Sequence, residues 1–144
     1  MGPRRRSREL AVQVLFQLEF NTDKSERSFD LICENFESPK GVRPYALQLV
    51  QGVCEQRSEL DALIRKASEN WRLERMPFLD RSILRLAVYE ILFISDVPPK
   101  VSIDEAVELG KKYGGEDSSG FLNGVLDRIF QTLSDQGRLG GKTP

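Results

Sequence analysis

The stretch FLDRSILRLAVYEILFI, residues Phe78–Ile94, decides the fold. Twelve of its seventeen positions are apolar, and on a helix they point to all sides. A helix that is apolar all round must be surrounded by other elements, so we expect this one at the centre of the molecule. Pro98 and Pro99 end it, because proline lacks an amide hydrogen and disfavours a helical conformation in the residue before it.

The segments on both sides carry apolar residues at positions i, i+3, i+4 and i+7, the spacing of one helix face. This pattern predicts helices with one buried side at about residues 7–20, 29–36, 46–53, 60–67, 102–113 and 118–133. Ser58 with Asp61, and Ser102 with Glu105, resemble capping boxes that begin two of them. No run of useful length alternates with period two, so we predict an all-α fold of about seven helices.

Length and composition indicate one soluble domain. The chain has 144 residues, 40% of them hydrophobic, which is enough for one core. We assign residues 1–136 to this domain and expect the tail 137–144, which has no apolar periodicity, to be disordered. No stretch of about 18 uncharged apolar residues is present, and the N-terminus does not resemble a secretory signal. We therefore expect no membrane contact and a cytoplasmic location.

The sequence lacks the residues and motifs that are typical of enzymes. The chain has no histidine, the commonest general base and metal ligand, and no Gly-rich phosphate loop, GxSxG or HExxH motif. Cys33 and Cys54 are 21 positions apart, which fits neither a metal site nor a disulfide framework, so we expect buried free thiols. The sequence predicts no enzyme, no metal site and no cofactor.

The net charge of −1 hides a basic N-terminus. Arg4, Arg5, Arg6 and Arg8 carry +4, which leaves −5 for residues 9–144. A basic arm on an acidic body is typical of a protein that contacts a polyanion at one place. A solvated, frayed terminus explains the same charges, so both interpretations stay open here.

Phe16 is the aromatic candidate for an RNA contact. On a helical wheel it lies about 160° from Leu18, the middle of the apolar stripe, and so points away from the core. An aromatic ring near guanidinium groups can stack an unpaired base while the arginines hold its phosphates. The alternative is that Phe16 packs against a second layer of helices.

A second candidate site is the loop between the helices predicted at 102–113 and 118–133. Gly114 and Gly115 free its backbone, and hydroxyls beside the unpaired amides of a helix N-terminus can bind phosphate or base edges. Ordinary helix caps at Gly114 and at Asp117 or Ser118 also explain most of the loop. The candidate residues are Lys112, Glu116, Asp117, Ser118, Ser119 and Phe121.

Four ordered motifs point to a known family. They are DRSILRLAVYE at 80–90, DVPPKV at 96–101, EAVEL at 105–109 and FLNGVLD at 121–127, together with the arginine-rich start RRRSRE. The chain closely resembles the bacterial transcription antitermination factor NusB family over nearly its whole length. The resemblance implies two small helical bundles packed around the central apolar helix.

The resemblance also implies a function and partners. In this family the protein binds boxA-type single-stranded RNA together with NusE, a ribosomal small-subunit protein. The pair joins an RNA polymerase complex with NusA and NusG and suppresses termination, notably in ribosomal RNA operons. The implied activity is RNA binding without catalysis.

The family's surfaces carry over to residues of this chain. RNA binding maps onto Arg4, Arg5, Arg6, Arg8, Phe16 and the segment 116–121. Binding of NusE maps onto Glu74, Asp80 and Arg81. From the residues alone, Asp80 also favours the first turn of the central helix electrostatically, and the two roles are compatible.

Two alternatives remain from the sequence. As a member of the family that it resembles, we expect the protein to be a monomer or weak homodimer when free; in the first alternative it is a helical module that binds no RNA and self-associates through its apolar surfaces. Or it is a stand-alone relative of the N-terminal domain of certain ribosomal RNA cytosine methyltransferases, with no cofactor-binding domain after Pro144.

Overall fold

The computed structural model describes residues 2–20, 41–68 and 72–140, and these contain helices and no strand. The elements are α1 (Pro3–Phe20), α3 (Arg43–Glu55), α4 (Arg57–Ala67), the 3₁₀ helix η1 (Leu73–Arg75), α5 (Phe78–Phe93), α6 (Pro99–Tyr113) and α7 (Ser118–Asp135). The all-α prediction is confirmed. The helix predicted at 29–36, which holds Cys33, lies outside the described residues.

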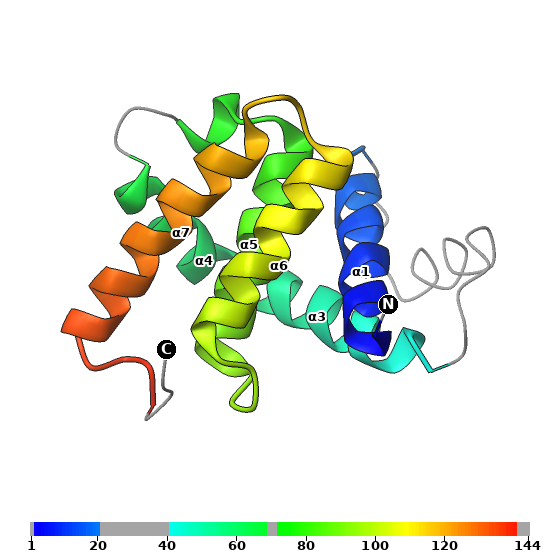
Figure 1. Ribbon diagram of the computed structural model, residues 1–144, viewed down its shortest axis with the longest axis horizontal. Helices are drawn as coiled ribbons and strands as arrows, with labels where there is room; N and C mark the ends of the chain where they lie inside the picture. Colours follow the sequence, from blue (N-terminus) through cyan, green and yellow to red (C-terminus); the bar gives the residue numbers. More distant parts are fainter. Residues whose placement is uncertain (1, 21–40, 69–71, 141–144) are drawn as a thin grey trace.

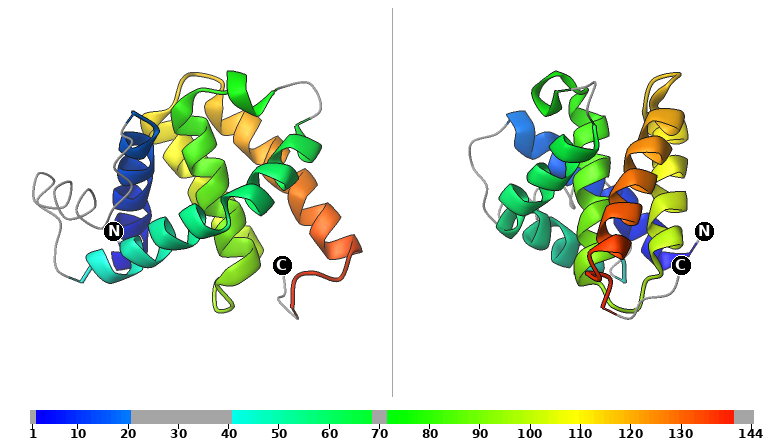
Figure 2. Two further views of the ribbon diagram at one scale, coloured as in Figure 1. Left: turned by 180° about the vertical axis from the view of Figure 1, so that it is seen from behind. Right: turned by 90° about the vertical axis from the view of Figure 1, so that its left-hand side faces the viewer.

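Helix α5 is the centre of the fold, as its composition predicts. It packs against α1, α3, α4, α6 and α7, and it runs through the middle of the molecule in Figure 1. Leu84, Ala87 and Ile91 on this helix are fully buried. Figure 2 shows α3 and α4 crossing α5 on one face while α6 and α7 cover the other.

The two small bundles share α5. Helices α1 and α3 pack on each other and on α5, whereas α4, α6 and α7 form the second group around the same helix. At Gly52 on α3, an added Cβ would lie 2.0 Å from the Tyr89 ring, so glycine permits α3 and α5 to approach closely at this point. No helix in the described ranges is both long and apolar enough to cross a bilayer.

Three helix starts differ from the sequence prediction. Helix α1 begins at Pro3, so the arginine-rich start is helical. Helix α6 begins at Pro99, because proline is favourable in a first helical turn, and the predicted Ser102 cap is wrong since this residue lies inside the helix. Helix α4 begins at Arg57 with no side-chain cap, and Asp61 instead accepts hydrogen bonds from Arg85.

Residues 137–140, part of the segment predicted to be disordered, form turns after α7. The backbone amide of Arg138 donates to Leu133 at 2.9 Å, its side chain pairs with Glu59, and Leu139 packs against the core. Residues 141–144 lie outside the described part. Cys54 forms no disulfide within the described residues, as predicted, but it is exposed rather than buried.

Leu84→Ala should lower the free energy of unfolding by about 2–5 kcal/mol, because it leaves a cavity around a fully buried side chain of α5. Phe93→Ala on the same helix is the control, since Phe93 is 42% exposed, and it should cost less than half as much. Urea unfolding followed by circular dichroism measures both, and equal losses would contradict the central position of α5.

Candidate nucleic-acid interface

Arg8 is buried, although the sequence placed it in an exposed basic arm. Its side chain is 4% exposed, and its Nε lies 2.8 Å from Oε2 of Glu90, which is fully buried on α5. The hydroxyl of Tyr45 on α3 donates to the same carboxylate oxygen. Burial, together with the charge of Glu90, raises the pKa of Tyr45, so the phenol remains a donor. The prediction that Arg8 lies at an open RNA surface does not agree with this position.

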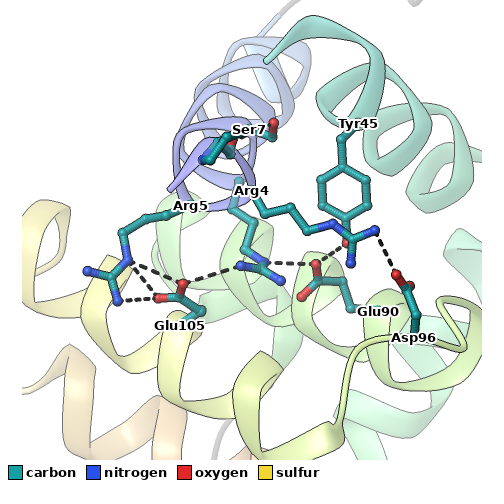
Figure 3. A network of polar contacts seen from close by, with 9 residues as sticks. Arg4, Arg5, Ser7, Tyr45, Glu90, Asp96 and Glu105 are labelled. Atoms are coloured by element: carbon teal, nitrogen blue, oxygen red, sulfur yellow. Dashed lines mark hydrogen bonds and ion pairs between the residues drawn. The ribbon is translucent and has the colours of Figure 1, made fainter. Parts of the chain in front are cut away.

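Arg5 and Arg4 are also paired with carboxylates. The Nε of Arg5 donates to both oxygens of Glu105 on α6, at 3.2 and 3.0 Å, and its Nη2 lies 2.8 Å from Oε2 (Figure 3). Glu105 thereby raises the pKa of Arg5. The Nη2 of Arg4 lies 3.0 Å from Asp96, and its guanidinium stacks 4.5 Å from the centre of the Tyr45 ring.

The fold therefore neutralises most of the basic arm. Arg6 is exposed and has no ion-pair partner in the part of the chain that the structure describes. The other three arginines face Glu90, Asp96 and Glu105. Neither a frayed terminus nor a patch carrying +4 describes this surface.

Glu9 joins the arm to the second candidate region. Its carboxylate accepts a hydrogen bond from the Lys112 ammonium and, at 2.7 Å, from the Tyr113 hydroxyl, so it fastens the end of α6 to α1. Burial opposes ionisation, but the bonds from Lys112 and Tyr113 outweigh it and lower the pKa of Glu9. Arg5, Glu105 and Lys112 consequently line one small hollow between the two helices.

Ser118 is not available to a phosphate, contrary to the sequence prediction. It is buried at the start of α7, where its hydroxyl donates to Asp80 at 3.0 Å and accepts from the amide of Gly115 at 3.0 Å. Glu116 and Asp117 are exposed, whereas Ser119 is half-buried. The exposed side chains at 116 and 117 are therefore carboxylates.

An open hollow of about 330 Å³ lies between this loop and the start of α5. Its lining residues are Met76, Pro77, Asp80, Gly115, Glu116, Asp117, Ser118 and Phe121. Three carboxyl groups and no lysine or arginine line it, and burial raises the pKa of Asp80. Such a surface suits a cationic side chain or the amino group of a base, and it disfavours phosphate.

Phe16 packs against another aromatic residue rather than beside the arginine arm. Its ring is half-buried and lies 5.1 Å from Phe20, which is 61% exposed and in turn lies 4.9 Å from Phe78. Arg5 and Phe16 are about 16 Å apart along α1. The guanidinium beside these rings belongs to Arg81, 4.4 Å from the centre of the Phe78 ring.

The residues predicted to bind NusE differ in exposure. Asp80 and Arg81 are buried, and Arg81 Nε has no hydrogen-bond partner in the described ranges. Glu74 on η1 is exposed and pairs with Arg65 of α4 at 3.0 Å. Of the three, only Glu74 is exposed, while Asp80 reaches the acidic hollow at the start of α5.

Sequence reasoning missed the carboxylates Glu9, Glu90 and Glu105. A signal existed for Glu90, since a charged residue inside a helix that is apolar all round requires a buried partner. Another existed for Arg8, which lies three and seven residues before Ala11 and Leu15 and therefore on the buried stripe of α1. In the part of the chain that the structure describes, no cluster of three or more acidic or cysteine residues could hold a metal ion.

Comparison with known proteins identifies the family whose sequences this chain matches. Residues 5–131 match the model of the NusB family. A protein named transcription antitermination protein NusB from Desulforapulum autotrophicum is 46% identical over 131 residues, which cover 90% of this chain and 92% of the relative. The protein of the same name from Geobacter sulfurreducens is 46% identical over 95% of this chain and 100% of its own length.

Solved structures agree with these relatives. NusB from T. maritima superposes with a TM-score of 0.82 at 42% identity, over 91% of this chain and 92% of that one. A chain from a crystal structure of the antitermination factors NusB and NusE in complex with dsRNA superposes with a TM-score of 0.82 at 28% identity. That match covers 92% of this chain and 98% of the other.

Arg8→Met should lower the free energy of unfolding by about 3 kcal/mol, because it leaves the buried Glu90 carboxylate without its cation. Arg6→Met, on the exposed side of α1, is the matched control and should change stability by less than about 0.5 kcal/mol. The double variant Arg8→Met/Glu90→Leu should recover part of the loss. Urea titration checks all three, and an Arg8→Met loss no larger than the control would refute the buried-pair interpretation.

Proposed function

The chain belongs to the NusB family, and we propose that it is a non-enzymatic, RNA-binding transcription antitermination factor that works with NusE. In this proposal the pair binds boxA-type RNA and joins NusA, NusG and RNA polymerase in a complex that suppresses termination, notably in ribosomal RNA operons. The protein works in the cytoplasm and is a monomer or weak homodimer when free.

One observation carries the proposal. Relatives that match this chain at 46% identity over at least 90% of both lengths are named transcription antitermination proteins. The structural similarity to a NusB chain solved with NusE and RNA supports the choice of partners. Similarity over nearly whole chains favours a shared function over a shared fold alone.

The RNA backbone follows the contact between α1 and α6 in our proposal. Arg4, Arg5 and Arg6 are exposed in the first turn of α1, and the exposed Lys112 at the end of α6 lines the same hollow as Arg5. Arg8 acts as a positioning residue, because its buried bond to Glu90 fixes the helix that carries the others. Phosphate contacts of this kind supply affinity and orientation without sequence selectivity.

Base selectivity and the protein partner belong to the other end of α1. Glu116 and Asp117 accept from base amino groups, since carboxylates repel phosphate, and the rings of Phe16 and Phe121 offer stacking surfaces. NusE contacts the exposed Glu74 on η1, just before α5, while the buried Asp80 and Arg81 support this region from the start of α5.

Fluorescence anisotropy tests the function directly. A labelled boxA-type RNA, a scrambled RNA and a boxA duplex are each titrated with the protein alone and with NusE, at two salt concentrations. We expect tighter binding to the boxA single strand when NusE is present. Equal, weak binding to all three RNAs that NusE does not change would refute the antitermination role. Light scattering on the same samples reports the oligomeric state.

Arg6→Gln should weaken binding to every RNA sequence alike and reduce the slope of log K against log salt by about 0.7, the loss of one single-strand phosphate contact. Lys66→Gln removes another exposed cation, on α4 in the other bundle; it is the matched control and should leave the slope unchanged. An unchanged slope for Arg6→Gln would exclude this residue from the RNA contact.

A further inference from the structure

Four charged side chains alternate in sign from the core to the surface. Glu90 is fully buried, Arg8 is 4% exposed, Glu105 is 15% exposed and Arg5 is 48% exposed. Glu105 bonds to both arginines, since Arg8 Nη1 lies 3.3 Å from its Oε1 and Arg5 contacts both of its oxygens. Figure 3 shows Arg5 and Glu105 at the outer end of this row.

Glu105 is the fixed partner in its contact with Arg5. Arg8, itself fixed by Glu90, holds the Glu105 carboxylate from below. Arg5 is half exposed and can leave, because an exposed ion pair is worth at most about 1 kcal/mol. Its Nε and Nη2 both face the carboxylate, and such a pair of guanidinium donors is also what binds a phosphate in bidentate fashion.

We propose that Glu105 competes with RNA phosphate for Arg5 and thereby limits the RNA affinity of the protein. The inference rests on the proposed function, in which α1 binds RNA. When a phosphate takes Arg5, the Glu105 carboxylate stays in place and loses one of its two cations. It then repels the phosphate and attracts a cation from solution, so Arg5 adds little to the net release of counterions.

The ion pair between Arg4 and Asp96 gives a weaker form of the same competition with phosphate. It consists of one contact at 3.0 Å between side chains that are 45% and 66% exposed, whereas Glu105 is 15% exposed and meets two nitrogens of Arg5. Asp96→Asn should therefore strengthen RNA binding less than the corresponding change at Glu105.

Glu105→Gln tests the competition, because glutamine keeps an oxygen for Arg8 but loses the charge. We expect binding to a single-stranded RNA to tighten about two- to fivefold, the range of one exposed ion pair. The slope of log K against log salt should steepen by about 0.7. Glu108→Gln is the matched control, since Glu108 lies one turn along α6 and pairs with Lys111 instead. Equal gains from both variants would mean a general charge effect and would overturn the proposal.

A double-mutant cycle isolates the pair. In an Arg5→Gln background, Glu105→Gln should give no further gain, because the carboxylate no longer has Arg5 to withhold. A gain that persists in this background would overturn the proposal, as would weaker binding by Glu105→Gln alone, which would make Glu105 a residue that orients Arg5 for RNA. Thermal unfolding of each variant verifies that the fold is retained.

Retention on heparin, a polyanion without bases, separates this inference from the proposed function. If the wild-type protein shows no RNA binding, the antitermination role fails. The competition is then judged only by the salt concentration at which each variant elutes from heparin. Glu105→Gln should elute at higher salt than Glu108→Gln. Identical elution of the two would refute the competition whatever the RNA result.

Discussion

The buried ion pair between Arg8 and Glu90 is the constraint on which the surface of this protein depends. A guanidinium and a carboxylate that are almost completely removed from water are tolerated only when they are paired, and here Tyr45 also donates to Glu90 while Glu105 also accepts from Arg8. The pair fixes α1 against α5 at one point. Arg4 and Arg5, two of the exposed arginines of α1, then face Asp96 in the loop before α6 and Glu105 on α6.

These ion pairs change the interpretation of the arginine-rich N-terminus. Four arginines within eight residues predict a strong basic patch. Three of them, however, form ion pairs with carboxylates from distant parts of the chain. The opposite end of α1 lies near aromatic rings, and an acidic hollow opens beside the start of α5. The molecule thus separates a group of arginines that pair with carboxylates from an acidic surface that suits amino groups or a basic protein.

The sequence predicts those features that depend on which side of a helix is apolar. The central position of Phe78–Ile94 and the buried stripe through Ala11 and Leu15 follow from spacing alone, and the structure confirms both. The spacing of apolar residues does not show which residue of another helix a given side chain contacts. Asp61 and Glu105 were therefore interpreted as helix caps, whereas the fold uses them to pair with Arg85 and Arg8 across the core. The family motifs supplied the function without revealing these pairings.

The contact between Arg8 and Glu90 joins residues 82 positions apart, which has a consequence for the order of folding. Helices α5, α6 and α7 are consecutive in the chain and pack on one another through short connections, so they can form early. Bringing α1 to α5 closes a long loop, which costs more conformational entropy. This cost is offset only by contacts with α5, so α5 must already be present. A nascent chain can therefore pair Arg8 and Arg5 with their carboxylates only after α5 and α6 have been synthesised.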